Sequence, residues 1–235
     1  MALSLEKQDH YRELYRARTP GWRPATERYE TVIRDHLRPG LRVLDVGCGR
    51  GGVLEQLGEL VDYPVGVDPD LASLREHRLA TLPRAAALSD ALPFAPESFD
   101  MILASWVLEH LDDPLRTLNT IRRTLTPGGL FIFLTPNARS LVALLNRLFR
   151  PFQTILVPRL YGRAEADTFP VRYRANTKSA LQHWAGRAGL QCERLFFIAD
   201  PSYLAFTPFL YRVSHALAQF TPPVHIVGVF RREAA

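Results

Sequence analysis

The chain has 235 residues, 47% hydrophobic and 23% charged, which are the proportions of a globular domain and exclude a disordered chain. Its net charge of +5 comes mostly from arginines spread along the chain. No basic block is interleaved with aromatic residues, so we expect no nucleic-acid substrate. Two cysteines far apart, Cys48 and Cys192, predict neither a disulfide framework nor a metal cluster.

The beginning of the chain, Met1 to Tyr15, has mixed charge and lacks the apolar region of a signal peptide. No stretch reaches the length of a charge-free membrane span. We therefore expect a cytoplasmic protein.

Residues 1–40 predict two helices that form an N-terminal helical cap. The first helix carries Tyr11, Leu14 and Tyr15 on one side, and the run Pro20 to Pro24 interrupts it. The second helix ends at Pro39-Gly40 and has an apolar side formed by Tyr29, Val32, Ile33 and Leu37. We expect the remaining part, residues 41–235, to form the main domain.

A strand that runs directly into a glycine-rich turn is the most informative feature of the main domain. The strand is the apolar run Val43 to Val46, and the residues after the turn have helical spacing (Val53, Leu54, Leu57 and Leu60). The turn itself contains Gly47, Gly49, Gly51 and Gly52. A strand, a glycine turn and a helix in this order open a nucleotide-binding βαβ unit. Three of the glycines also fit the dinucleotide pattern G-x-G-x-x-G, so this motif leaves the nucleotide open.

The next strand ends in an acid that is available for a ligand. Asp68 follows Val65 to Val67, and it lies at the carboxyl end of a neighbouring parallel strand, where a carboxylate can accept hydrogen bonds from ribose hydroxyls. Asp70 is better placed than Asp68 to cap the helix that follows. We therefore assign Asp68 to the ligand.

Three further motifs follow in a fixed order. They are the run from Ser89 to Phe94, a strand with its extension from Ser98 to Leu111, and a proline-glycine-glycine turn with a strand from Leu125 to Phe133. With the glycine turn and Asp68, the stretch 40–137 resembles the class I S-adenosylmethionine-dependent methyltransferases. The resemblance is to the branch that includes ubiquinone/menaquinone-type and other small-molecule methyltransferases. It implies S-adenosyl-L-methionine as the cofactor.

The fold class that follows is α/β. Alternating strands and helices over residues 41–136 predict a parallel sheet with helices on both faces. Two more strands are expected at Leu190–Ala199 and His225–Arg231. The family resemblance implies a Rossmann-like, mostly parallel seven-stranded sheet with an antiparallel last strand.

The resemblance also implies which residues bind the cofactor. The glycine loop faces the methionine part, Asp45 orients the loop or meets the amine, and Asp68 holds the ribose. The adenine amine meets Asp90, a ring nitrogen meets the Ala91 N–H, and Leu92 with Phe94 gives apolar cover. Trp106 lines the pocket near the methyl group. The predicted cofactor set is Asp45, Gly47, Cys48, Gly49, Asp68, Pro69, Asp90, Ala91, Leu92, Ser105 and Trp106.

Two residues in or near this set have a second interpretation. We interpret Cys48 as a packing residue and not as a nucleophile, because a small side chain fits the glycine loop. Arg50 is either a solvated loop arginine or a phosphate ligand in a dinucleotide enzyme.

The acceptor side is less defined by the sequence. A helical insertion near 137–175 and a second apolar segment at 202–220, with Pro208 bending or interrupting it, either pack on the sheet, cover a hydrophobic pocket, or dock at a membrane surface. Asp167 to Thr177 mixes charged and aromatic residues in a presumed loop, and Asn176 or Thr177 is expected to cap the next helix. The predicted acceptor contacts are Tyr11, Trp22, Arg172 and Tyr173.

The predicted activity is methyl transfer to a small, partly hydrophobic acceptor, at oxygen. His110 is either the general base or a residue that orients Glu109 and packs below the cofactor. We see no metal triad of the catechol-methylating kind and predict no metal. The alternatives are an NAD(P)-linked oxidoreductase with the same glycine turn and a non-catalytic methyltransferase-like partner subunit. Acceptor identity and oligomeric state are not predicted.

Overall fold

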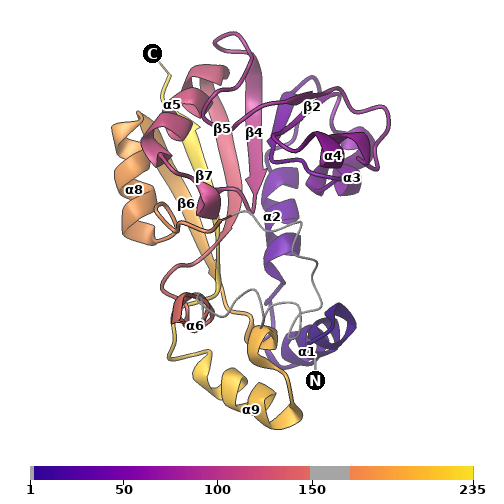
Figure 1. Cartoon of the computed structure of the whole chain (residues 1–235), viewed down its shortest axis with the longest axis vertical. Coiled ribbons are helices and arrows are strands. Elements are labelled where there is room, and N and C mark those ends of the chain that lie inside the picture. Colours follow the sequence, from indigo (N-terminus) through magenta and orange to yellow (C-terminus); the bar gives the residue numbers. More distant parts are fainter. Residues whose placement is uncertain (1–2, 149–169, 235) are drawn as a thin grey trace. The chain divides into compact units, whose positions relative to one another are not determined.

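The protein forms a seven-stranded sheet, in a computed structural model that describes residues 3–148 and 170–234. The strand order is β3-β2-β1-β4-β5-β7-β6 (Figure 1). The strands are β1 (Arg42–Val46), β2 (Tyr63–Asp68), β3 (Arg84–Ala86), β4 (Phe99–Ser105), β5 (Leu125–Pro136), β6 (Leu190–Ile198) and β7 (His225–Arg232).

The first five strands are parallel, and the last strand runs antiparallel to β5. The pairs β1 with β2, β1 with β4, β2 with β3 and β4 with β5 are all parallel. The Asn137 N–H just after β5 donates to the Val224 carbonyl just before β7, at 2.7 Å. At the other end of the pair, Arg232 of β7 donates to the carbonyl of Leu125, the first residue of β5. Both predicted final strands and the predicted reversal of the last strand are therefore confirmed.

The central strands are buried on both faces, as a parallel sheet covered by helices requires. The rings of Phe131, Phe133 and Phe230 are fully buried and lie 4.9–6.3 Å apart. Gly228 on β7 makes room for this cluster, because a Cβ atom there would lie 2.2 Å from the Phe133 ring. An alanine at this position would force the ring to move in a close-packed core.

The helices lie on both faces of the sheet, as predicted. In Figure 1, α5 and α8 lie on one side of the sheet and α2, α3 and α4 on the other. Tyr29 fixes α2 to the central strands by donating from its hydroxyl to the Ile132 carbonyl at 3.4 Å. The helices are α1 (Leu5–Arg18), α2 (Ala25–Arg34), α3 (Val53–Leu57), α4 (Leu71–Arg75), α5 (Pro114–Thr124), α6 (Leu141–Leu148), α8 (Lys178–Arg187) and α9 (Pro208–Leu217), with 3₁₀ turns η1 (Gly58–Leu60), η2 (Leu108–His110) and η5 (Pro201–Leu204).

The chain folds into two compact units. The sheet unit comprises Thr26–Thr135, Val171–Phe196 and Val227–Ala235. The helical unit comprises Met1–Ala25, Pro136–Pro170 and Phe197–Ile226. Each unit is described separately below.

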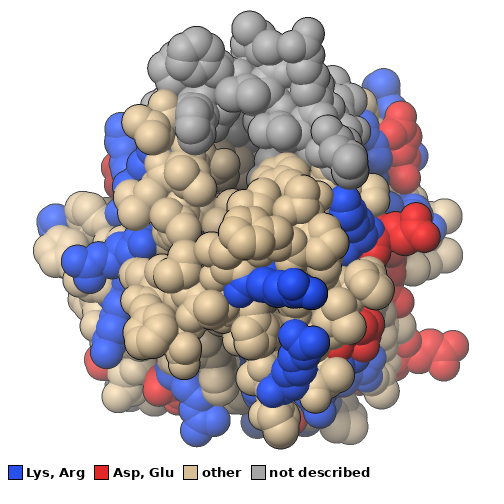
Figure 2. Space-filling model, turned by 90° about the horizontal axis from the view of Figure 1, so that it is seen from below, with Lys and Arg blue, Asp and Glu red and all other residues tan. Residues whose placement is uncertain are grey.

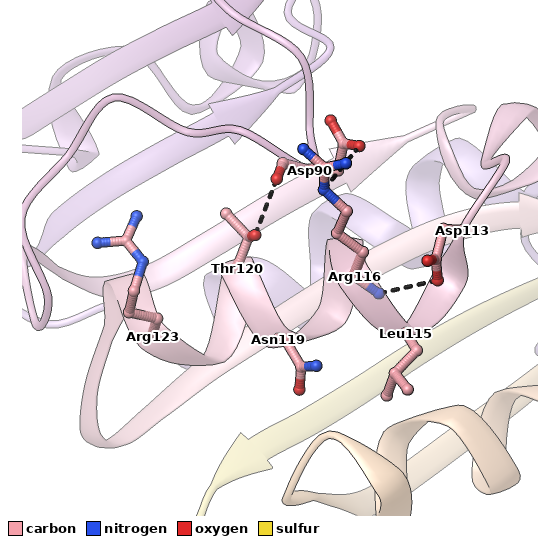
Figure 3. Close-up of a pocket in the computed structure, with 7 residues that line it drawn as sticks. All are labelled: Asp90, Asp113, Leu115, Arg116, Asn119, Thr120 and Arg123. Carbon is pink, nitrogen blue, oxygen red and sulfur yellow. Dashed lines mark hydrogen bonds and ion pairs between the residues drawn. The ribbon is translucent and has the colours of Figure 1, made fainter.

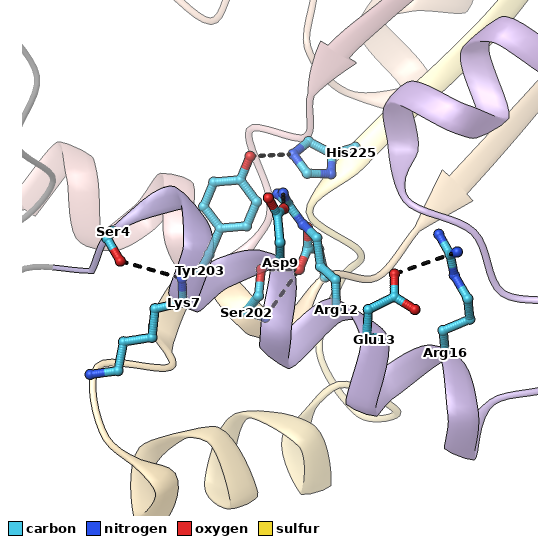
Figure 4. A network of polar contacts seen from close by, with 10 residues as sticks. Ser4, Lys7, Asp9, Arg12, Glu13, Arg16, Ser202, Tyr203 and His225 are labelled. Carbon is cyan, nitrogen blue, oxygen red and sulfur yellow. Dashed lines mark hydrogen bonds and ion pairs between the residues drawn. The ribbon is translucent and has the colours of Figure 1, made fainter.

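A buried ion pair and an aromatic cluster hold the helical unit together. Arg12 on α1 donates from Nε to the Asp200 carboxylate at 3.0 Å, and its guanidinium lies 5.8 Å from the centre of the Tyr203 ring. Figure 4 shows Tyr203 turned towards His225, and the Tyr203 hydroxyl and His225 Nε2 are 3.2 Å apart. Burial lowers the pKa of His225 to about 4, so this imidazole is neutral at neutral pH.

Two local expectations concern helix ends. Pro208 interrupts the apolar segment, which is one of the two roles predicted for it: η5 ends at Leu204, and Pro208 is the first residue of α9, where its missing N–H and fixed φ are compatible with a helix start. The expectation for Leu60 was wrong, because α3 ends at Leu57 before Gly58, and Leu60 is 54% exposed and does not extend the apolar side of α3. A hydrophobic repeat does not encode where a helix ends.

Candidate functional site

The glycine turn between β1 and α3 is held in place by its neighbours at the carboxyl edge of the sheet. The N–H groups of Gly47 and Cys48 donate to the Val67 carbonyl at 2.8 and 3.1 Å. Gly47 has a φ of +76°, and a Cβ atom there would lie 2.4 Å from Cγ2 of Val107. A side chain at position 47 would therefore meet both backbone strain and a steric clash.

Two carboxylates lie beside this turn. Asp45 is 3% exposed and Asp68 is 8% exposed. A Cβ atom on Gly52 would lie 3.7 Å from Oδ2 of Asp45, and one on Gly49 would lie 4.0 Å from Oδ2 of Asp68. The glycines thus leave backbone accessible beside the two acids, and this arrangement favours a ligand with positive charge or hydroxyl groups.

Asp68 and Asp45 differ in the hydrogen bonds that their carboxylates accept. Asp68 accepts from the Gly49 N–H at 2.9 Å and from the Asp70 N–H at 2.8 Å, so it is not as unengaged as the sequence suggested. A carboxylate has about four acceptor sites, so Asp68 retains capacity for a diol. Asp45 accepts no hydrogen bond from any residue that the structure describes. Burial, and then the charge of Asp68, raise the pKa of Asp45 to about 7.

Four other residues in or near the turn are engaged in packing, ion pairing or capping, or are exposed. Cys48 is buried, and burial raises the pKa of its thiol to about 12, so it packs and does not act as a thiolate at neutral pH. Arg50 pairs with Glu76 at 2.6 Å on the surface. Asp70 caps α4 by accepting from the N–H groups of Ala72 and Ser73, as predicted. Pro69, between Asp68 and Asp70, is exposed.

The predicted adenine contacts after β3 are engaged within the protein. Figure 3 shows Asp90 beside α5, where its carboxylate pairs with Arg116 at 3.3 Å. The Ala91 N–H donates to the Leu88 carbonyl at 3.0 Å, and Leu92 is buried. A hollow of about 370 Å³ lies between Asp90 and α5. Leu88, which was not among the predicted site residues, is 59% exposed two residues after β3 and offers apolar cover at this edge.

The loop after β4 contains a strained residue. Ser105 ends the strand and is half-buried, whereas Trp106 is 37% exposed with a φ of +59°. A bulky residue in the left-handed region is unfavourable and persists only where its surroundings fix it. Here its N–H donates to the Leu134 carbonyl at 2.9 Å. His110 ends the 3₁₀ turn that follows and is half-buried.

A buried carboxyl in the same loop, Glu109, was not among the predicted site residues. Its Oε2 lies 3.2 Å from the Thr135 hydroxyl, and burial raises the pKa of the carboxyl to about 7. Asn176 completes the network when its amide oxygen accepts from the Glu109 N–H and the Thr135 hydroxyl and its NH₂ donates to the Leu108 carbonyl. A protonated Glu109 then donates to the Thr135 hydroxyl, which in turn donates to the Asn176 amide oxygen.

The same loop carries the segment with two predicted acceptor residues. The N–H groups of Arg172 and Tyr173 donate to the Glu109 carbonyl at 2.6 and 3.1 Å. Arg172 also pairs with Asp112 at 2.9 Å. Thr177 caps α8, as predicted, and Asn176 does not. The structure therefore brings Arg172 and Tyr173 to the Trp106–His110 loop through backbone contacts. Asp167 to Phe169 lie outside the described residues.

The other two predicted acceptor residues belong to the helical unit. Tyr11 is 5% exposed and stacks on Tyr211, with 4.5 Å between ring centres. Trp22 packs edge-on against Tyr15 and donates its indole N–H to the Ala199 carbonyl at 2.7 Å. Both side chains are engaged in packing within this unit. Among residues 3–148 and 170–234, no group of three or more His, Cys, Asp or Glu side chains forms a candidate metal site.

A family comparison decides what kind of protein has this sheet and this glycine turn. A model of the methyltransferase domain matches residues 12–195. The chain belongs to this methyltransferase family. The predicted recognition as a class I S-adenosylmethionine-dependent methyltransferase is confirmed, and S-adenosylmethionine is the methyl donor of this class.

Curated relatives of the family cover parts of the chain. A ubiquinone biosynthesis O-methyltransferase of Cereibacter sphaeroides is 36% identical over 104 residues, which are 42% of each chain. A demethylmenaquinone methyltransferase of a Mycobacterium species is 28% identical over 166 residues, which are 69% of each chain. The match thus spans less than half the length of the ubiquinone enzyme and about two thirds of the menaquinone enzyme.

Solved structures agree with the fold. A Haloferax volcanii putative methyltransferase, solved as a complex with the Trm112 activator, aligns with a TM-score of 0.67 at 20% identity over 90% of both chains. An S-adenosylmethionine-dependent methyltransferase of Mesorhizobium loti aligns with a TM-score of 0.58 at 21% identity, over 86% of this chain and 96% of that one. At these identities the likeness concerns the fold.

Proposed function

We propose that this methyltransferase binds S-adenosylmethionine at the glycine turn and methylates a small, partly apolar molecule at a hydroxyl oxygen. The observation that carries the proposal is Asp45. It is a buried carboxylate beside a glycine turn and has no donor among the described residues. A buried carboxylate in this state is costly unless a ligand supplies a positive or hydrogen-bonding partner.

The donor set at the turn fits the proposed cofactor. Asp45 would hold the ammonium group of the methionine part, and Asp68 would accept from the ribose hydroxyls beside the Gly49 N–H. Leu88 would cover the adenine, with Ser105 and Trp106 at the strand end nearest the methyl group. When bound, the cofactor supplies a methyl group on a positively charged sulfur, which is already electrophilic.

The part left to the protein is to position the acceptor and to remove its proton. A hydroxyl acceptor needs a base, because its oxygen is a weak nucleophile while protonated. We assign this role to the half-buried imidazole of His110, on the loop whose Glu109 is hydrogen-bonded to Thr135 and Asn176. Tyr173 reaches the same loop by a backbone hydrogen bond and is proposed to contact the acceptor.

The choice of oxygen and of an apolar acceptor is supported by the relatives. One of the most similar curated proteins is named for O-methylation in ubiquinone biosynthesis and another for methylation of demethylmenaquinone. Both names refer to quinones, and only the first specifies methylation at oxygen. We propose a hydroxylated aromatic acceptor for this chain on that basis.

Cofactor binding can be tested by calorimetry and thermal unfolding with S-adenosylhomocysteine and, separately, with NADH. We expect stabilisation by S-adenosylhomocysteine alone, by about 2.7 kcal/mol at a hundredfold excess over Kd. Stabilisation by NADH alone would support the oxidoreductase alternative and reject the proposal.

The reaction can be tested with labelled S-adenosylmethionine and a panel of hydroxylated aromatic molecules. His110→Ala is expected to lower kcat by about 10²–10⁴-fold while cofactor binding is kept. The matched control is His183→Ala on α8, which should leave both unchanged. A product methylated at carbon or nitrogen would reject the oxygen assignment, and a normal kcat in the His110 variant would reject the base.

A further inference from the structure

Helix α9 of the helical unit has an unusual orientation, because its most apolar side faces outward. Phe209 is 70% exposed, and Leu210, Val213 and Leu217 are 39–41% exposed. Phe220, in the turn that follows, is 79% exposed. Residues 209, 213, 217 and 220 recur at intervals of three or four, so they form one stripe along the helix. We call this stripe, together with Leu210 beside it, the α9 face.

The opposite side of α9 is fixed by specific contacts. Tyr211 is buried and stacks on Tyr11, and His215 packs edge-on against Tyr15 with 5.3 Å between ring centres. The Ser214 hydroxyl donates to the Pro201 carbonyl at 3.0 Å. A surface helix normally buries its apolar side. Because Tyr211, Ser214 and His215, which carry polar atoms, take the buried side here, the α9 face is directed away from the core of its unit.

The neighbouring helix α6 extends this exposed apolar surface. Leu144 and Leu148 are 49% and 69% exposed. Leu141 and Leu217 line the same narrow hollow, so α6 and α9 are neighbours in this unit. Contiguous exposed apolar surface of this kind marks an interaction site in a folded protein.

The charged side chains of α6 and α9 themselves have one sign, whereas α1 of the same unit carries both signs. No aspartate or glutamate occurs between Asp200 and Glu233, or within residues 137–148. Arg212 on α9 is exposed and forms no ion pair with the residues that the structure describes. Figure 2, which views α9 from below, shows a mainly uncharged surface with Lys or Arg side chains across it and acidic side chains towards its edges. This pattern is complementary to an anionic surface.

We propose that the α9 face docks on an anionic phospholipid membrane, with α9 lying in the plane of the interface. Exposed phenylalanines and leucines beside arginines are typical of helices that bind the headgroup region. A symmetric pairing of two copies through this face would bring Arg212 towards its own counterpart, which opposes a dimer. No described helix is long and apolar enough to traverse a bilayer. The proposal does not depend on the methyl-transfer reaction.

The test is sedimentation of the full chain with vesicles of phosphatidylcholine alone and of equal parts phosphatidylcholine and phosphatidylglycerol. We expect binding to the mixed vesicles that is at least about tenfold stronger and that weakens with salt. Equal binding to both vesicle types would overturn the charge argument. Absence of binding to either would overturn the proposal.

Variants show whether this face is responsible. Phe209→Glu with Phe220→Glu is expected to lower the partition coefficient by about 100-fold. The control is Leu60→Glu, which changes a 54% exposed leucine of the sheet unit and should bind as the parent does. S-adenosylhomocysteine binding checks that each variant is folded. Retained vesicle binding in the double variant, or a parent dimer that this variant dissociates in light scattering, would overturn the proposal.

Discussion

Asp45 in the sheet unit and Asp200 in the helical unit are equally buried, each at 3% exposure, but their surroundings are opposite. Asp200 accepts from Arg12 Nε at 3.0 Å and from the N–H and hydroxyl of Ser202 at 3.0 and 2.5 Å. Asp45 accepts from no described residue and has a second acid as its neighbour. Burial alone thus does not mark a functional acid.

The comparison teaches that the missing partner is the informative feature. The Asp200 network joins α1 to η5 and so stabilises the helical unit. Asp45 adds nothing comparable, and its carboxylate opposes folding when it is charged. A position with this cost is expected where a ligand completes the hydrogen bonds.

The largest expected effect is a loss of stability when Asp200 loses its partner Arg12. Arg12→Met leaves a buried carboxylate without its cation and is expected to lower the free energy of unfolding by about 3–5 kcal/mol. Urea unfolding measures this. The control is Arg34→Met, whose pair with Glu30 is exposed, with an expected loss of at most about 1 kcal/mol. Equal losses in the two variants would contradict the assignment of Asp200 as a structural acid.

Removal of the charge at Asp45 should affect ligand binding instead. Asp45→Asn is expected to weaken S-adenosylhomocysteine binding by about 10–100-fold, because a charge-assisted hydrogen bond contributes about 1.5–3 kcal/mol. The unliganded variant should be at least as stable as the parent at neutral pH, because a desolvated charge is gone. Calorimetry and urea unfolding measure the two effects. Unchanged affinity would remove the main support for the proposed cofactor site.

The two regions should respond to pH with opposite signs. The folded-state pKa of Asp45 is raised from 3.8 to about 7, so the native state holds more protons in this window and stability falls as pH rises through it. Glu109 acts in the same direction between 4.5 and about 7. The folded-state pKa of His225 is lowered from 6.5 to about 4, so its contribution is lost as pH falls through that window.

Each contribution changes the slope of stability against pH by at most about 1.4 kcal/mol per pH unit. Asp45→Asn should therefore gain stability relative to the parent as pH rises from about 4 to about 7. His225→Gln should lose stability relative to the parent over the same rise. Urea unfolding across this range measures both differences. Parallel curves for a variant and the parent would show that the group does not titrate as assigned.

The smallest expected effect compares one substitution in both units. Thr177 caps α8 with a 3.1 Å hydrogen bond from the Ala180 N–H, and Thr207 caps α9 with a 3.2 Å hydrogen bond from the Leu210 N–H. Changing either threonine to alanine should cost about 1 kcal/mol in urea unfolding. We expect Thr207→Ala alone to weaken vesicle binding as well, because it loosens the first turn of the α9 face. Weaker vesicle binding in both variants would point to a general loss of folding.

The sequence by itself determined the sheet and the family. The buried runs of β1, β4 and β5 and the glycine turn have local signatures, because strand burial and positive φ restrict which residues fit. Asp70 as a cap and Cys48 as a packing residue followed from the same kind of local chemistry. The order of the motifs then separated a methyltransferase from a dinucleotide enzyme.

Only the tertiary structure decided which polar groups already have partners. Asp90 pairs with Arg116, and Glu109 meets Thr135 and Asn176, across separations of 26 residues or more that no local pattern encodes. The outward direction of the α9 face was equally hidden, because a hydrophobic repeat gives the stripe but not the side that packs. That side was set by Tyr11 and Pro201, which the fold brings to α9 from elsewhere in the chain.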